Sequence, residues 1–338
     1  MTFNIAILGA SGAVGRIMLK ILYDRDFPVK NIYPLSSKRS SGKEINFGKK
    51  KLKFINVENF DFSNVSIALF SAGSEISKKW APIAGNNGCV VIDNTSCFRM
   101  EKDVPLIIPE INLNSLIKFK DRNLIANPNC STIQMLLALK PLHDLVKIKR
   151  IVVSTYQSVS GAGKNAIDEL YNQTKSILNK EEVKNNFFPV QIANNVIPHI
   201  DKFLENRYTK EEMKMVWETQ KILNDKNILV NPTAVRIPVF YGHSEAVHLE
   251  TNTKINQADA VKLMNDADGV EVIDGVDMGE YPTAVSDGSG TDPVYVGRIR
   301  EDISHENGLN LWIVADNIRK GAALNTVQIA EILIEEYL

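Results

Sequence analysis

Cysteine is scarce in this chain of 338 residues, and its spacing matches no metal or disulfide pattern. The three cysteines, Cys89, Cys97 and Cys130, make neither an even secreted set nor a CxxC pair. We therefore expect free thiols in a reducing compartment and no bound metal. One of the three is a candidate for a chemical role.

An excess of charge of either sign is also absent. The 39 Lys and Arg residues and the 40 Asp and Glu residues give a net charge of −1, which argues against a nucleic-acid partner. No apolar run reaches the ~18 residues of a spanning helix, and the N-terminus lacks the basic segment of a signal peptide. We expect a cytoplasmic protein that binds a small molecule and neither nucleic acid nor a membrane.

The first 130 residues alternate short apolar runs with segments of helical periodicity. This alternation predicts an α/β protein with a Rossmann-type, doubly wound parallel sheet. One helix is expected over Ser74–Asn87. The expected strands are Phe3–Leu8, Ile32–Leu35, Val65–Ser71, Val90–Asp93 and Leu124–Ala126.

The pattern changes after about residue 130. A long helix, Ser131–Leu142, is followed by longer strands such as Ile151–Ser158 and His243–Thr253, which predicts an α+β domain. Apolar residues at helical spacing in Ala322–Leu338 predict a terminal helix that packs back onto the first domain. The expected domains are residues 1–130 with the helix 320–338, and residues 131–319.

A glycine motif, GASGAVG at residues 9–15, lies between the first strand and the first helix. Glycines in this position let the backbone turn tightly beside a pyrophosphate, and the helix N-terminus then faces the anion. The spacing is GxxGxxG rather than the more familiar GxGxxG, and a simple connecting turn is the alternative. The position after a strand favours a dinucleotide-binding site.

The segment after the second strand, SSKRSS at residues 36–41, indicates which dinucleotide binds. An NAD site usually carries an acidic residue here for the ribose hydroxyls, whereas this chain has hydroxyls and Arg39. A guanidinium suits a 2′-phosphate, so NADP is favoured over NAD. A solvated basic loop is the alternative. Near the other end of the chain, Asn317 follows a predicted strand and could bind the nicotinamide amide.

The chemical candidate among the cysteines is Cys130, in the motif NPNCST at residues 127–132. Pro128 favours extended backbone before it and Asn129 is a good helix cap, so Cys130 is expected at the start of a helix. The helix dipole there favours a thiolate, and the N–H groups of the first turn can hold an oxyanion. Cys89 and Cys97 are expected to be structural.

A cysteine nucleophile needs a partner that moves a proton, and that partner is often remote in the sequence. His243, in the motif RIPVFYGHS at residues 236–244, meets this requirement at the start of a predicted strand. Arg236 begins the same motif and could bind a carboxylate through two hydrogen bonds. A surface ion pair is the alternative for Arg236.

Together these segments resemble the aspartate-semialdehyde dehydrogenase family over the length of the chain. The other matching segments are SAGSEIS at 71–77, DNTSCFRM at 93–100, SVSGAGK at 158–164, ETQKIL at 218–223 and DNIRKGAALNTVQIAE at 316–331. The resemblance implies NADPH-dependent conversion of 4-aspartyl phosphate to L-aspartate 4-semialdehyde through a cysteine thioester. It also implies a place in lysine, methionine, threonine and diaminopimelate biosynthesis, and a homodimer formed through the second domain.

The resemblance further implies roles for individual residues. The implied catalytic and substrate-binding residues are Cys130 as nucleophile, His243 as acid/base, and Gln157, Arg236 and Glu218 around the substrate. The residues implied to hold the phosphoryl group or inorganic phosphate are Arg99 and Lys221, with Lys214 as a second candidate. The residues implied to bind the cofactor are Ser11, Gly12, Ala13, Val14, Arg39, Ser40, Ser160, Gly161 and Asn317.

Three other classes share parts of this pattern. N-acetyl-glutamyl-phosphate reductase also uses a thioester, but its acylated amine leaves no role for Glu218. Glyceraldehyde-phosphate dehydrogenase is chemically close, but the residues around Cys130 and His243 fit it poorly. A non-catalytic NADP-binding paralogue is expected to lack the nucleophile, the base or the carboxylate clamp, and this chain has all three.

Overall fold

The computed structural model describes all 338 residues, Met1–Leu338, and divides into two compact units. The first unit joins Met1–Asn129 to Ala322–Leu338, and the second unit is Cys130–Gly321. No helix in either unit has the length and the apolar character needed to cross a membrane.

The first unit is built on a six-stranded sheet in which every pairing is parallel. The strand order is β5-β2-β1-β6-β7-β8, so the chain winds outward from β1 in both directions. The strands are β1 (Phe3–Leu8), β2 (Val29–Ser36), β5 (Ile55–Asn56), β6 (Ile67–Phe70), β7 (Val90–Asp93) and β8 (Leu124–Ala126). The prediction of a Rossmann-type, doubly wound sheet is confirmed.

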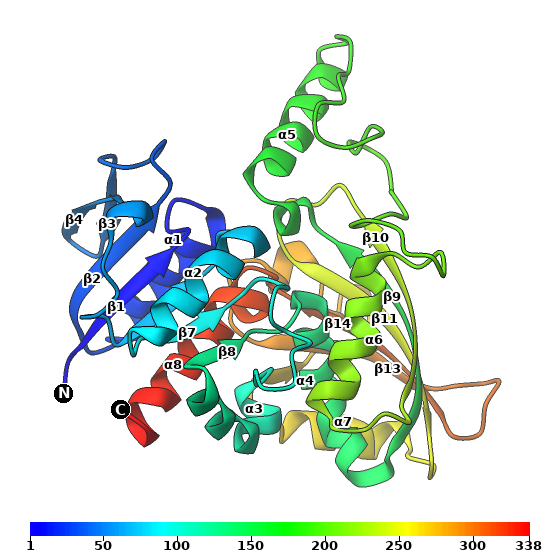
Figure 1. Cartoon of the computed structure of the whole chain (residues 1–338). Helices are drawn as coiled ribbons and strands as arrows, with labels where there is room; N and C mark the ends of the chain where they lie inside the picture. Colours follow the sequence, from blue (N-terminus) through cyan, green and yellow to red (C-terminus); the bar gives the residue numbers. More distant parts are fainter. The chain divides into compact units, whose positions relative to one another are not determined.

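Helices cover this sheet and complete its core. They are α1 (Ala13–Asp24), α2 (Ser74–Asn86), the short α3 (Pro109–Asn112) and α8 (Leu324–Glu336), with 3-10 turns at Val57–Asn59 and Leu113–Asp121. The C-terminal α8 packs against α1 and β7, and it shares one hydrophobic core with β1 (Figure 1). An ion pair of 2.7 Å between Arg25 and Glu331 joins α8 to the end of α1.

A two-stranded antiparallel hairpin, β3 (Glu44–Phe47) and β4 (Lys50–Lys53), follows β2 and is absent from the elements expected from the sequence. Ile45 is buried in the core of the first unit, and Leu52 packs against that core. The lysines around Leu52 hide the alternation of a half-buried strand, which explains why the apolar pattern does not predict it.

The second unit contains a mixed six-stranded sheet of order β10-β9-β11-β14-β13-β12. The pairs β10/β9 and β12/β13 are parallel, and the other three pairs are antiparallel. The strands are β9 (Ile148–Gln157), β10 (Leu229–Arg236), β11 (His243–Thr251), β12 (Val270–Val272), β13 (Val294–Glu301) and β14 (Gly308–Ala315). The predicted α+β character of this part is confirmed.

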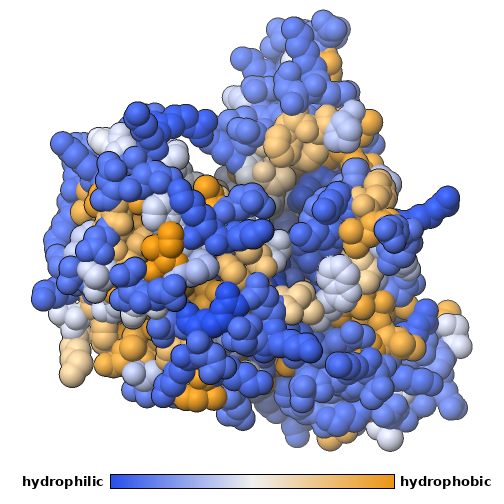
Figure 2. Space-filling model, viewed as in Figure 1, coloured by the Kyte–Doolittle hydropathy of each residue, from blue (hydrophilic) through white to orange (hydrophobic).

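Helix α4 (Cys130–Val146) packs against the sheet between α6 (Lys210–Ile222) and α7 (Gln257–Asn265). It begins one residue before the expected Ser131 and ends four residues after the expected Leu142. Helix α5 (Lys164–Leu178) follows a 3-10 turn, Val159–Ala162, and projects from the unit at the top of Figure 1. Figure 2 shows that its outer end is mostly hydrophilic.

Candidate active site

The glycine turn of the first unit packs closely against neighbouring backbone. Gly9 has a φ of +92°, and a Cβ there would lie 2.5 Å from the Ser71 carbonyl oxygen. A Cβ on Gly15 would lie 2.4 Å from the Gly9 carbonyl oxygen, so only glycine fits either position. Helix α1 then begins without a side-chain cap or an acidic residue in its first turn, which leaves its N-terminus suited to an anion. The expected cofactor residues in this turn are Ser11, Gly12, Ala13 and Val14.

The loop after β2 presents cations to solvent. Lys38 and Arg39 are exposed, and neither makes an ion pair. The Gly42 N–H donates to the Phe54 carbonyl oxygen at 2.9 Å, which ties the loop to the hairpin β3–β4. Since β2 ends at Ser36, Arg39 lies at the carboxyl edge of the sheet, where doubly wound folds bind their ligands.

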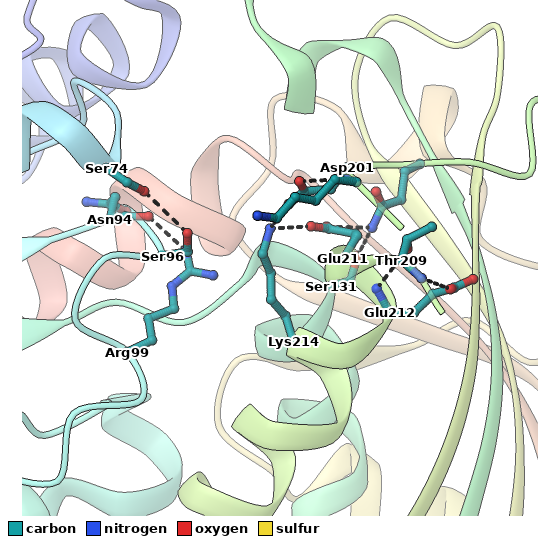
Figure 3. Close-up of polar contacts among 12 residues, drawn as sticks. Ser74, Asn94, Ser96, Arg99, Ser131, Asp201, Thr209, Glu211, Glu212 and Lys214 are labelled. Atoms are coloured by element: carbon teal, nitrogen blue, oxygen red, sulfur yellow. Dashed lines mark hydrogen bonds and ion pairs between the residues drawn. The ribbon is translucent and has the colours of Figure 1, made fainter. Parts of the chain in front are cut away.

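Arg99 is buried at the carboxyl edge of the same sheet. Its Nε donates to the Asn127 carbonyl oxygen at 2.9 Å, and its Nη2 donates to the Asn94 carbonyl oxygen at 2.8 Å. Asp93 holds the same loop by accepting from the Thr95 hydroxyl at 2.7 Å, and burial raises the pKa of Asp93. The guanidinium is therefore fixed by the loops that follow β7 and β8, and Figure 3 shows it below Ser74 and Ser96.

Cys130 is the first residue of α4. The helix dipole and the N–H groups of the first turn can stabilise a thiolate or an oxyanion there. A Cβ at Gly321 would lie 2.7 Å from the Cys130 Cβ, so a larger residue at 321 would displace the cysteine. The other two thiols are less suited to attack, because burial raises the pKa of Cys89 and of Cys97.

Gln157, the last residue of β9, lies between the starts of α4 and α6. Its Nε2 donates to the Ser131 hydroxyl at 2.6 Å and to Glu211 Oε1 at 3.3 Å. Because Ser131 follows Cys130 in the chain, these bonds hold the amide beside the expected nucleophile. They also connect it to a carboxylate that the resemblance does not assign.

Glu211 and Lys214 form the charged part of this arrangement. Lys214 Nζ lies 2.7 Å from Glu211 Oε2 and 3.0 Å from Asp201 Oδ2. Figure 3 shows Lys214 pointing toward Glu211. A capping box of Thr209 and Glu212 fixes the start of α6, with the Thr209 N–H donating to Glu212 Oε2 at 2.6 Å. The first turn of α6 therefore carries Glu211 into the site in a defined position.

Glu218 and Lys221, the residues expected from the resemblance, lie seven residues further along α6 than Glu211 and Lys214. At 1.5 Å per residue, this puts them about 10 Å farther along the helix axis. The structure thus brings Glu211, rather than Glu218, into hydrogen-bond contact with Gln157.

The sequence did contain a signal for this placement. The capping-box pattern begins at Thr209 and marks the start of a helix. A helix that leads into a neighbouring strand starts near the carboxyl end of that strand. Here the Ala234 N–H near the end of β10 donates to Glu212 Oε1 at 3.0 Å. The first turn of α6, and not its middle, is therefore the part that reaches the edge of the sheet carrying Gln157.

Arg236 is the last residue of β10 and is only 5% exposed. Its Nη1 donates to the Ser158 carbonyl oxygen at 2.6 Å. Burial lowers the pKa of the guanidinium, while the charges of Glu211 and Cys130 act in the opposite direction. An arginine remains cationic in proteins, so Arg236 offers its other N–H groups to a carboxylate.

His243 begins β11 and is completely buried. The Ser158 N–H donates to its Nδ1 at 3.1 Å, and the Ser158 hydroxyl lies 3.1 Å from the same atom. Because a backbone N–H can only donate, Nδ1 is an acceptor and the ring proton is on Nε2. Burial, assisted by Arg236, lowers the pKa of His243 to about 3, so the ring is neutral near pH 7.

The protonated Nε2 of His243 has no hydrogen-bond partner in the protein. Gly161 faces it, and a Cβ there would lie 3.3 Å from this nitrogen and 3.3 Å from Arg236 Nη1. Glycine at this position leaves room over both groups. A substrate oxygen can accept from the buried Nε2–H donor at this place.

Asn317 and Ser160, two expected cofactor residues, brace the histidine. Asn317 Oδ1 accepts from the Ser158 hydroxyl at 3.1 Å and from the Gly242 N–H at 3.0 Å. Its Nδ2 donates to the Ser160 hydroxyl at 3.0 Å. Both residues thus hold Ser158 and His243 in position, and their contact with a cofactor stays a prediction.

A second carboxyl group lies under the start of α4, and no motif indicates it. Glu245 of β11 is fully buried next to Ser131 and Gln134, although neither contact reaches full hydrogen-bond geometry. Burial raises the pKa of Glu245 well above its usual value. Burial therefore favours the protonated form of this carboxyl group in the folded protein.

Two family models cover most of the chain. Residues 4–119 match the NAD binding domain of semialdehyde dehydrogenases, and residues 139–320 match their dimerisation domain. The fold and the site around Cys130 accordingly define an oxidoreductase of the semialdehyde dehydrogenase class.

Relatives that align with the whole length of the chain identify one family within this class. Aspartate-semialdehyde dehydrogenase from Shewanella violacea is 59% identical over 335 residues, which are 99% of this chain and 98% of the relative. That from Aquifex aeolicus is 53% identical over 341 residues, covering 100% of both chains. A crystal structure of aspartate semialdehyde dehydrogenase II complexed with ASA from Vibrio cholerae is 58% identical, with a TM-score of 0.98 and 100% of each chain covered. The chain belongs to the aspartate-semialdehyde dehydrogenase family, as its motifs predict.

Proposed function

We propose that this enzyme catalyses the NADPH-dependent reductive dephosphorylation of 4-aspartyl phosphate to L-aspartate 4-semialdehyde, a step toward lysine, methionine, threonine and diaminopimelate. The observation that carries this proposal is the pair of bonds from Gln157 to Ser131 at 2.6 Å and to Glu211 at 3.3 Å. They join a nucleophile-bearing helix to a carboxylate. With Arg236, the site offers one negative and one positive group, as a free amino acid requires.

The contacts favour Glu211 and Lys214 for the roles that the resemblance gives to Glu218 and Lys221. Glu211 receives the substrate ammonium, because it already accepts a hydrogen bond from Gln157. Lys214 and Arg99 receive the phosphoryl group, since two cations suit a dianionic leaving group. Arg236 binds the substrate carboxylate.

The cofactor residues fit NADP better than NAD. NADPH supplies a hydride ion to the substrate carbon when it is bound. The close glycine turn before α1 suits the pyrophosphate, and the exposed Arg39 at the end of β2 suits a 2′-phosphate. The match to an NAD binding domain supports a dinucleotide at this place.

The first chemical step is attack by the Cys130 thiolate on the acyl carbon. The carbon–sulfur bond forms, the bond between that carbon and the phosphate oxygen breaks, and phosphate leaves with the bonding electrons. The N–H groups at the start of α4 hold the oxyanion of the tetrahedral intermediate. A thioester on Cys130 remains.

The second step returns the enzyme to its starting state. Hydride addition to the thioester carbon places a negative charge on its oxygen, and His243 stabilises that charge through Nε2–H. Collapse of this adduct breaks the carbon–sulfur bond, releases the aldehyde and regenerates the thiolate. His243 thus acts as a neutral hydrogen-bond donor, which refines the acid/base role implied by the resemblance.

The match of residues 139–320 to a dimerisation domain supports a homodimer. Light scattering after size-exclusion chromatography is expected to give twice the mass of the chain. A monomer that retains full activity would contradict this part of the proposal.

The activity is tested with purified protein, aspartate semialdehyde, phosphate and either NADP or NAD, by following the reduced nicotinamide. We expect reduction only when all three components are present, with NADP preferred. N-acetyl-glutamate semialdehyde is the matched control substrate, because its acylated amine cannot pair with Glu211. Equal rates with both semialdehydes would contradict the proposed substrate, and a preference for NAD would contradict the proposed cofactor.

A further inference from the structure

The positive charge of this chain is concentrated in one short segment. Residues 38–53 contain seven Lys or Arg residues and one Glu, which leaves 32 Lys or Arg against 39 Asp or Glu in the rest of the chain. Nearly all of this segment lies in the loop after β2 and in the hairpin β3–β4. The net charge of −1 is therefore the sum of a cationic hairpin segment and an otherwise anionic chain.

The cations of the hairpin are directed to water. Lys43, Lys49, Lys50 and Lys53 are exposed and take part in no ion pair. Lys51 is the exception, at 3.3 Å from Glu44. Figure 2 shows mostly hydrophilic residues over this hairpin, at the upper left of the view. Their positive field is therefore not cancelled by neighbouring carboxylates.

The hairpin is held in a fixed position next to the loop that carries Arg39. The Phe54 N–H donates to the Lys43 carbonyl oxygen at 2.9 Å, and the Gly42 N–H donates to the Phe54 carbonyl oxygen at 2.9 Å. On the other side, Ile45 is buried in the core of the first unit. Lys43 and Lys53, at the base of the hairpin, are thus anchored beside the proposed 2′-phosphate site, whereas the turn at Gly48 lies against Tyr23 near the end of α1.

We propose that the hairpin β3–β4 is a cationic approach surface that steers the polyanionic dinucleotide to the loop at Arg39 and raises its rate of association. This inference depends on the proposed use of NADPH. The lysines act before docking, so they change the association rate and leave the dissociation rate and the chemical step unaltered.

Electrostatic reasoning explains why such a surface is needed here. NADPH carries a pyrophosphate and a 2′-phosphate, and the remainder of the chain has an excess of acidic residues that repels it. A local patch of like charges can raise association rates by about tenfold to a thousandfold, and salt screens it over about 10 Å at 0.1 M. Cations on one hairpin therefore offset the repulsion near the site, where it matters most.

The test compares two double variants that remove the same charge. Lys43→Gln and Lys53→Gln are combined at the base of the hairpin, and Lys118→Gln and Lys120→Gln serve as the control. The control lysines are also exposed, but they lie before the N-terminal end of β8, at the edge of the sheet opposite to Arg39. Stopped-flow fluorescence with NADPH measures association and dissociation rates across a salt series.

We expect the hairpin variant to bind NADPH about three to ten times more slowly at 0.1 M salt, and the control to stay within about twofold of the wild type. The difference should shrink at about 0.5 M salt, with dissociation and kcat unchanged. Equal slowing in both variants, or a faster dissociation in the hairpin variant, would overturn the steering role. Failure of the wild type to bind NADPH at all would instead contradict the proposed cofactor, which separates the two outcomes.

Discussion

In the first unit the loop that we assign to the cofactor carries the exposed cations Lys38 and Arg39, whereas the polar groups near Cys130 in the second unit are buried. Gln157 is 1% exposed, Arg236 is 5% exposed and His243 is 0% exposed. Water and salt weaken the charges of the first group, so each contributes modestly to binding. The second group lies in a low-dielectric environment, where a single hydrogen bond or proton has large consequences. Substitutions in the second unit should therefore have the larger effects.

The largest effect is expected at the nucleophile. Cys130→Ala removes the thioester route and should lower kcat by about four orders of magnitude or more in the semialdehyde assay. Cys97→Ala is the matched control and should stay within about threefold of the wild type, because burial raises the pKa of that thiol. Appreciable turnover by the Cys130 variant would contradict the thioester mechanism.

The next largest effect concerns His243. Loss of one oxyanion donor costs about 10²- to 10³-fold in kcat, and we expect this from His243→Ala. His243→Gln can still donate an N–H and should retain more activity. Since burial lowers the pKa of His243 to about 3, the ring stays neutral above that pH. The kcat profile should therefore show no ionisation between about pH 6 and pH 7 that belongs to His243. An ionisation in that pH range that is absent from the profile of the Gln variant would show that His243 acts as an acid or base.

A smaller effect compares two positions on α6. Glu211→Gln should raise the KM for aspartate semialdehyde by about 10- to 100-fold, because the substrate ammonium loses its charge partner. Glu218→Gln removes the same charge two turns away and should change KM by less than about threefold. The reverse result would show that the substrate binds further along α6.

The raised pKa of the buried Glu245 can be tested through the pH dependence of the free energy of unfolding. Burial raises the pKa of Glu245 well above its usual value, so the folded state keeps a proton that the unfolded chain releases at lower pH. The free energy of unfolding therefore falls as pH rises, by about 1.4 kcal/mol per pH unit, until the folded carboxyl group ionises. Glu245→Gln lacks this pH dependence and should gain stability relative to the wild type as the pH rises above the usual titration range of a glutamate, measured by urea unfolding. A constant difference would show that Glu245 is ionised in the folded state.

The smallest effect is expected in the exposed cofactor loop. Arg39→Ala should raise the KM for NADP by about fivefold and leave the KM for NAD unchanged, because a solvated phosphate contact is worth about 1 kcal/mol. The effect should decrease at high salt, unlike the effects of the buried variants. A loss as large as that of Glu211→Gln would remove the contrast between the two units.

The pattern of apolar residues along the chain was enough to predict much of the fold. β1, β7 and β8 have the bounds that their apolar runs predict, because parallel strands buried on both faces are continuously apolar. The hairpin β3–β4 was not predicted, because four lysines surround its one inward-facing leucine. The terminal helix begins at Leu324, two residues later than expected, after a π-helical turn over Arg319–Ala323 that apolar periodicity does not reveal.

A candidate site residue was predictable where its neighbours in the sequence are enough to place it. Cys130 is an example, since a cap and an apolar helix are enough to place a thiol at a helix start. The choice between Glu211 and Glu218 was not predictable from spacing, because both are followed by a lysine three residues later on the same helix. The capping box at Thr209 marks the first turn of α6, and the hydrogen bond from Gln157 to Glu211 at 3.3 Å shows that this turn makes the contact.

The sequence by itself determined the family, the doubly wound parallel sheet and the position of Cys130 at the start of a helix. These properties depend on neighbours along the chain, where periodicity and helix capping act. The tertiary structure decided the ring tautomer of His243, the raised pKa of Glu245 and the position of Glu211 beside Gln157. These depend on burial and on partners more than 50 residues away along the chain.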